Sequence, residues 1–204
     1  MTMRVLIVSK TRMQHGVCVG GMDLSTGRYV RLMERGNRYQ SSDTPFEIGQ
    51  VWDLRAIDRN PVQAPHVEDI IVLERKLVDQ VDDMATFIRD RNTIDHIGGF
   101  DGLFEGLVRC TPAGTGYVPA DGPMPQRSVG FWVSDRLLAL SQDYKTKYVY
   151  SPWPDTRKLS YVGFPDPIEE IPAGTIIRVS LSKLYTPPEG TAPSGYYLQL
   201  SGWY

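Results

Sequence analysis

The spacing of apolar residues in the first 78 positions constrains the fold most strongly. Short runs that are apolar, or that alternate between apolar and polar residues, are separated by glycine, proline and asparagine turn signals. The runs expected to form strands are 5–8, 17–22, 28–33, 51–57 and 66–78. Five short strands with this spacing are typical of a small closed barrel, so residues 1–78 are predicted to form a first barrel.

The middle of the chain has a different pattern. Residues 79–105 are rich in acidic side chains and carry apolar residues at helical spacing, which predicts an amphipathic helix with aspartates at its start and arginines near its end. The glycine-rich stretch 98–107 indicates a second short helix. The prolines and glycines of residues 111–127 predict a loop. Residues 79–127 are therefore expected to form a helical, Gly/Pro-rich connection.

The last third returns to strand patterns. The runs expected to be strands are 128–140, 147–150, 158–164, 175–184 and 196–204. Residues 128–204 are therefore predicted to form a second barrel. The predicted fold class is mainly β with a small α component, with two barrels joined by the helical, Gly/Pro-rich middle.

Composition indicates an ordinary globular protein. The chain has 204 residues, of which 41% are hydrophobic, and no apolar run approaches the roughly 20 residues of a membrane span, so no membrane partner is expected. Its first residues lack the features of a signal peptide, and a cytoplasmic location is predicted. Cys18 and Cys110 have no CxxC partner, so neither a disulfide framework nor a zinc site is indicated, and no cofactor is predicted.

A local excess of positive charge lies in the first barrel. Residues 4–33 contain five basic residues and one acidic residue, although the whole chain carries 22 basic and 24 acidic residues. Lys10 and Arg12 are two positions apart and share one face of an extended segment, and Arg31 joins them if the strands pair suitably. Such a patch favours phosphate as a ligand. The alternative is that these are solvated side chains on the open face of a sheet.

Several motifs resemble a known family. They are SKTRM, CVGGMD and RYVRLM, the PHVED block at residues 65–69, and later FWVSDRLLAL, IIRVSLSKLY and YYLQLSGWY. Together they resemble the dual OB-fold module of bacterial proteins, over nearly the whole chain. The resemblance implies two OB-type barrels and a nucleic-acid-binding role that serves bacterial defence or conflict systems.

An OB barrel binds single strands through a basic groove that follows the phosphates and through aromatic side chains on which bases stack. Single-stranded DNA or RNA is therefore the expected partner of a non-catalytic module. The candidate nucleic-acid-binding residues are Lys10, Arg12, Arg28, Arg31, Trp153, Arg157 and Lys158. Trp153 is included because it lies between two prolines in a loop; for Tyr29, Trp52 and Trp132, packing is favoured over stacking.

A further group of residues provides an enzymatic alternative. His66, Glu68 and Asp69 form a candidate pocket, because histidine titrates near neutrality and a carboxylate two positions on shares its strand face. Metal sites usually need three or more ligands at recognisable spacing, so no metal is predicted and a structural role is favoured. The alternatives are a nucleotide-acting hydrolase using these three residues, or a protein-interaction subunit of larger machinery, which the net charge of -2 allows.

Overall fold

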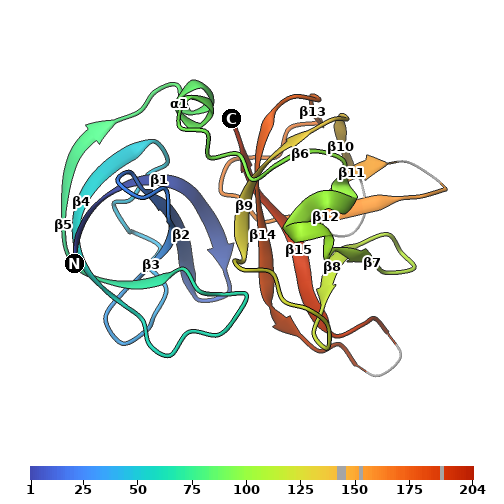
Figure 1. Cartoon of the computed structure of the whole chain (residues 1–204), viewed down its shortest axis with the longest axis horizontal. Coiled ribbons are helices and arrows are strands. Elements are labelled where there is room, and N and C mark those ends of the chain that lie inside the picture. Colours follow the sequence, from blue (N-terminus) through green and yellow to red (C-terminus); the bar gives the residue numbers. More distant parts are fainter. Residues whose placement is uncertain (142–145, 152–153, 189–190) are drawn as a thin grey trace. The chain divides into compact units, whose positions relative to one another are not determined.

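The computed structural model describes residues 1–141, 146–151, 154–188 and 191–204. The chain divides into two compact units, Met1–Thr93 and Ile94–Tyr204, and each consists mainly of strands (Figure 1). In the part of the chain that the structure describes, no helix has the length and apolar character needed to cross a membrane.

The first unit is a closed five-stranded barrel. Its strands are β1 (Thr2–Met13), β2 (Gly16–Asp23), β3 (Tyr29–Met33), β4 (Gln50–Asp58) and β5 (Asp69–Gln80). They follow one another around the barrel in the order β1-β2-β3-β5-β4, and β4 pairs with β1 to close it. Only the β3–β5 pair is parallel. The five strands agree with the five predicted from alternation, and the barrel is the one expected of an OB fold.

A bulge in β1 helps to close this barrel. The register of β1 against β2 shifts between Ile7 and Ser9, where one extra residue enters the strand. Such a bulge bends a strand and increases its twist. The long β1 therefore pairs with β4 through Thr2–Leu6 and with β2 through Val5–Met13.

The predicted amphipathic helix is present as α1 (Met84–Asp90) and belongs to the first unit. Asp83 caps it, because its side chain accepts a hydrogen bond of 2.9 Å from the backbone N–H of Thr86. Met84 and Ile88, four residues apart on one face, are buried. Arg89 lies in the last turn, where the helix dipole favours a cation.

The remainder of the expected connection belongs to the second unit. It contains β6 (His96–Gly98), the 3₁₀ helix η1 (Phe100–Gly102), α2 (Leu103–Gly106), β7 (Arg109–Cys110) and β8 (Gly116–Pro119). Residues 111–127 are thus not a continuous loop, because β8 pairs with β15 (Gly195–Trp203). A Cβ atom on Gly116 would lie 2.6 Å from the Phe100 ring, so glycine is needed there for close packing. Pro119 ends the strand, where a missing N–H is tolerated.

The strands of the second unit pair in the same order as those of the first. They are β9 (Val129–Ser134), β10 (Leu138–Ser141), β11 (Lys147–Ser151), β12 (Arg157–Tyr161), β13 (Glu170–Ile171), β14 (Ile176–Tyr185) and β15. The sheet order is β13-β10-β11-β12-β15-β14-β9-β6, and β12 and β15 are parallel. Between them, β10 pairs with β11 and β9 with β14, as β1 pairs with β2 and β4, and only three residues separate β9 from β10; we therefore take the two together as the counterpart of β1.

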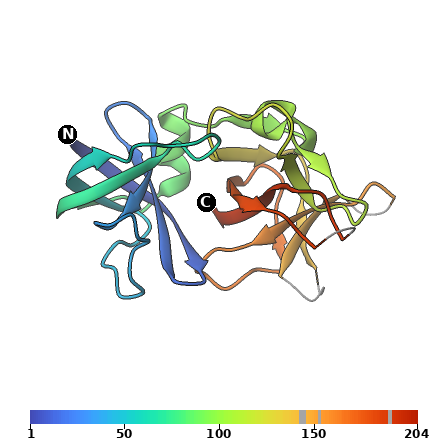
Figure 2. The same ribbon diagram turned by 90° about the horizontal axis from the view of Figure 1, so that it is seen from below.

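With this assignment, β11, β12, β14 and β15 correspond to β2, β3, β4 and β5, and the parallel pair falls between the same two strands. Figure 2 shows the yellow-to-red strands of this unit in a second view. Both units therefore have the OB pairing order.

Candidate nucleic-acid interface

The structure separates the cations of the predicted first patch. Lys10 lies opposite Val19, which is fully buried, so its row of side chains faces the barrel interior. Arg31 lies opposite Gly20, in the neighbouring row, which faces outward. The bulge in β1 shifts the alternation by one residue and places the two cations on opposite faces of the sheet. Arg12 is exposed near the end of β1.

Lys10 is held inside the protein. Its side chain is 7% exposed, and its ammonium nitrogen lies 2.7 Å from a carboxylate oxygen of Glu47. The carboxylate of Glu47 neutralises this buried cation, while the Glu47 side chain itself is 61% exposed and remains in contact with water. This placement indicates a structural role for Lys10.

Arg31 is part of a buried ion-pair cluster around Asp69. The side chain of Asp69 is 2% exposed; one of its oxygens accepts from Arg31, and the other lies 2.6 Å from a guanidinium nitrogen of Arg59. Burial alone would raise the pKa of Asp69, but the hydrogen bonds and charges of the two arginines outweigh it and lower the pKa. Burial also acts to lower the pKa of Arg31, but interactions that include the hydrogen bond to Asp69 outweigh it, so this pKa lies above its ordinary value. Through Asp69, the cluster links Arg59 of the β4–β5 loop to Arg31 of β3.

Arg28 lies in the turn between β2 and β3 and forms a 2.8 Å ion pair with Asp58. The two side chains are 41% and 48% exposed. Exposed pairs of this kind are weak. Arg28 can therefore exchange its partner for another anion more easily than Arg31 can.

The His66, Glu68 and Asp69 group lies at the end of the β4–β5 loop and the start of β5. Glu68 is buried, and its backbone carbonyl accepts a 2.8 Å hydrogen bond from the N–H of Arg31. Both oxygens of Asp69 already bind guanidinium groups, so this carboxylate is not placed to act as a base. Among residues 1–141, 146–151, 154–188 and 191–204, no three His, Cys, Asp or Glu side chains come together as a metal site.

The sheet of the second unit presents two lysines on the face of β11 and β12. Tyr148 and Leu159 lie opposite each other, and both are fully buried in the core. Lys147 and Lys158 occupy the alternate positions of the same two strands and therefore point outward. Lys158 was a sequence candidate, whereas Lys147 was missed, although the alternation of Lys147 with the buried Tyr148 marks it as outward-facing.

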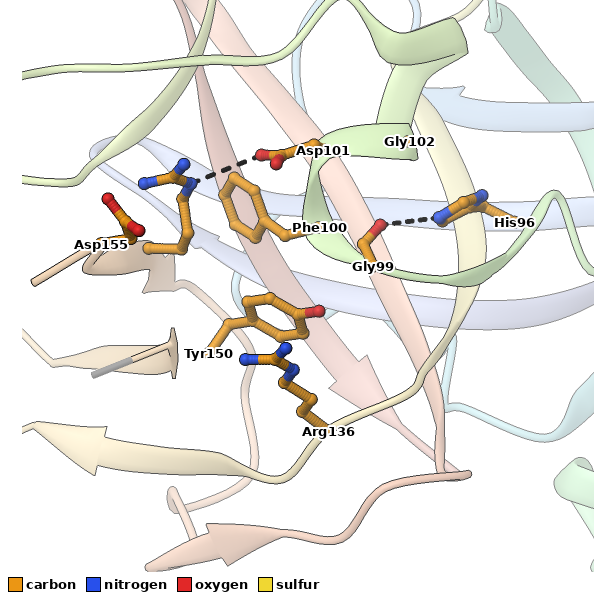
Figure 3. Close-up of a pocket in the computed structure, with 9 residues that line it drawn as sticks. His96, Gly99, Phe100, Asp101, Gly102, Arg136, Tyr150 and Asp155 are labelled. Atoms are coloured by element: carbon orange, nitrogen blue, oxygen red, sulfur yellow. Dashed lines mark hydrogen bonds and ion pairs between the residues drawn. The ribbon is translucent and has the colours of Figure 1, made fainter. Parts of the chain in front are cut away.

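The remaining sequence candidates are distributed differently. Arg157 begins β12 and lines a cavity of about 340 Å³ together with Arg136 and Tyr150 (Figure 3). Trp153 lies outside the described residues. The aromatic residues for which packing was favoured are all buried: Tyr29, Trp52 and Trp132.

Comparisons with known proteins give a family match over nearly the whole chain. A family model described as "Dual OB-containing domain" matches residues 3–203. No curated protein matches the chain. A solved structure of a murine DNA-binding protein bound with double-stranded DNA is similar over 100% of this chain and 93% of its own length, at 9% identity and a TM-score of 0.36. A TM-score this low carries no argument about function.

Proposed function

Because the chain belongs to the dual OB-containing domain family, we propose that it is a non-catalytic module that binds single-stranded nucleic acid. OB folds bind oligonucleotides on the face of their second and third strands. The observation that carries the proposal is the pair of outward-facing lysines, Lys147 and Lys158, on the corresponding strands β11 and β12 of the second barrel.

The equivalent face of the first barrel is less suited to phosphate. Its outward arginine, Arg31, binds a buried carboxylate that also binds Arg59. A phosphate that binds Arg31 would have to displace Asp69. The buried Asp69 carboxylate would then lose one of its two guanidinium partners, which is costly. The exposed cations Arg12 and Arg28 are candidates for additional contacts with the strand.

The hydrolase alternative receives less support. It needs His66, Glu68 and Asp69 to act together on a substrate, and Asp69 is engaged on both oxygens. We therefore favour binding without catalysis. The family resemblance further suggests that the module serves larger protein machinery of a bacterial defence or conflict system in the cytoplasm.

The test compares two double variants that change the charge equally. Lys147→Ala with Lys158→Ala removes the β11–β12 cations, and Lys76→Ala with Lys183→Ala removes two exposed lysines elsewhere; each takes the net charge from -2 to -4. Fluorescence anisotropy of labelled single strands of about 16 nucleotides, as DNA and as RNA, measures the affinity of the full chain at low salt.

Loss of two charge-assisted contacts at about 1 kcal/mol each should weaken binding by roughly 30-fold in the first variant. The control should stay within about twofold, because Lys76 lies on β5 and Lys183 on β14, outside the β11–β12 face. A duplex of the same sequence should bind more weakly than the single strand. Equal losses in both variants, or no binding by the parent protein, would refute the proposal.

A further inference from the structure

A cavity of about 340 Å³ lies in the second unit, within the size range of small-molecule sites. Four segments of the chain build it (Figure 3). Tyr150 comes from the end of β11, Arg157 from the start of β12, and Arg136 from the turn between β9 and β10. The fourth segment is residues 96–102.

An aromatic ring with a fixed orientation lies at the base of the cavity. The hydroxyl of Tyr150 donates a 2.7 Å hydrogen bond to Asp135, and the Phe100 ring lies 5.7 Å away. Burial raises the pKa of Tyr150, so its hydroxyl stays protonated at neutral pH. The guanidinium of Arg136 lies 5.7 Å from the centre of the Tyr150 ring, within cation–π range.

Glycines allow the fourth segment to border the cavity without filling it. His96 holds the segment through a 2.7 Å hydrogen bond between its ring Nε2 and the carbonyl of Gly99. A Cβ atom on Gly102 would lie 2.3 Å from the His96 ring, and one on Gly99 would lie 3.3 Å from the Tyr150 hydroxyl. Larger residues at these positions would push the segment away or occupy the space.

The walls of the cavity place guanidinium groups beside carboxylates. Arg136 and Arg157 line it together with Asp101 and Asp155. The contact between Arg157 and Asp101 is 3.4 Å long, and the Asp101 side chain is 78% exposed. Such a pair is weak, so both groups can bind a ligand at little cost.

We propose that this cavity binds one guanine base of the bound strand, an inference that rests on the proposed function. Guanine offers two adjacent acceptors, O6 and N7, which match one guanidinium. It also offers two adjacent donors, N1–H and the N2 amino group, which match one carboxylate. No other standard base presents both pairs of groups. Arg136 would bind the acceptor edge and Asp155 the donor edge, while Arg157 and Asp101, which already contact each other, would add further contacts.

Trp132 provides a local reporter of ligand binding. Its indole N–H donates a 2.8 Å hydrogen bond to the carbonyl of Gly98, next to the cavity-lining Gly99. The indole N–H of Trp52 reports on the first unit, where it donates to Gln50. Guanosine, adenosine, cytidine and uridine monophosphates, and inorganic phosphate, are titrated into the ¹⁵N-labelled full chain. The indole resonances are then followed, after assignment by Trp→Phe replacement.

Guanosine monophosphate should shift the Trp132 resonance, leave that of Trp52 in place, and bind at least about tenfold more tightly than uridine monophosphate. Asp155→Asn and Arg136→Ala should each weaken guanosine monophosphate binding by about tenfold. The matched control Asp121→Asn, which changes an exposed aspartate elsewhere in the second unit, should stay within about twofold.

Equal responses to guanosine monophosphate, uridine monophosphate and inorganic phosphate would overturn the inference. The inference would also be overturned if the Trp132 resonance did not shift with guanosine monophosphate while the protein bound oligonucleotides through Lys147 and Lys158. That result would leave the proposed strand-binding function intact. A selective response to guanosine monophosphate by a protein that binds no oligonucleotide would support the cavity as a nucleotide site and refute the proposed strand-binding function.

Discussion

Replacing Asp69 by asparagine should destabilise the first barrel strongly. The substitution keeps the shape of the side chain but removes the charge that two guanidinium groups share in a site where the carboxylate is 2% exposed. Removing one partner of a buried ion pair costs about 3–5 kcal/mol. The low end applies here, because Arg59 is 37% exposed and can regain water, so we expect a loss of about 3 kcal/mol.

Urea unfolding of the full chain measures this loss, with the Trp52 indole resonance as the reporter for the first unit. With a denaturant dependence of about 1.5 kcal/mol per molar urea, the midpoint should fall by roughly 2 M. The matched control is Asp53→Asn, which breaks the exposed pair with Arg4 and should move the midpoint very little.

The destabilisation should also depend on pH. The pKa of Asp69 is lower in the folded protein than in the unfolded chain, so its charge stabilises the fold above the unfolded value of about 3.9. That contribution is lost as the pH falls through the lower, folded pKa. The gap between parent and Asp69→Asn should be complete at neutral pH and shrink below about pH 4. A midpoint shift no larger than that of Asp53→Asn, or one independent of pH, would refute the reasoning.

Two other substitutions test separate parts of the account. Lys10→Met should change the unfolding free energy by no more than about 1 kcal/mol, because the site is buried and Glu47 remains hydrated. Oligonucleotide affinity should not change, and a tenfold loss of affinity measured by anisotropy would indicate that Lys10 contacts the nucleic acid. Glu105 has a left-handed backbone (φ 57°), and Glu105→Gly should stabilise the protein by up to about 1 kcal/mol, because the relieved strain exceeds the added entropy of glycine. A lower thermal midpoint would contradict this.

The alternation of side chains predicted most of the strands. The five runs in residues 5–78 correspond to β1 to β5, because their core positions are apolar, in continuous runs in β1 and β2 and in alternation with polar residues in β4. The helix α1 was equally readable from its apolar spacing and the capping Asp83. The strand β8 was missed because its glycine and proline, which usually mark turns, serve close packing and strand termination there.

The candidate site was less predictable. Lys10 and Arg12 share one face of β1, as expected from their spacing, but the bulge opposite Gly20 and Gly21 turns Lys10 toward the interior. Arg31 was recognised as a cation, but its neutralisation depends on Asp69, which lies on another strand. The cavity of the second unit combines residues from four segments, and only the folded chain brings them together.

The salt dependence of binding tests the central claim most directly. The affinity of a single strand falls with salt in proportion to the number of phosphates that the protein neutralises, with a logarithmic slope of about -0.7 per contact. The slope for Lys147→Ala with Lys158→Ala should therefore be shallower than that of the parent by roughly 1.4, and the slope for Lys76→Ala with Lys183→Ala should match the parent. Identical slopes for all three proteins would contradict the assignment of the phosphate contacts to the β11–β12 face.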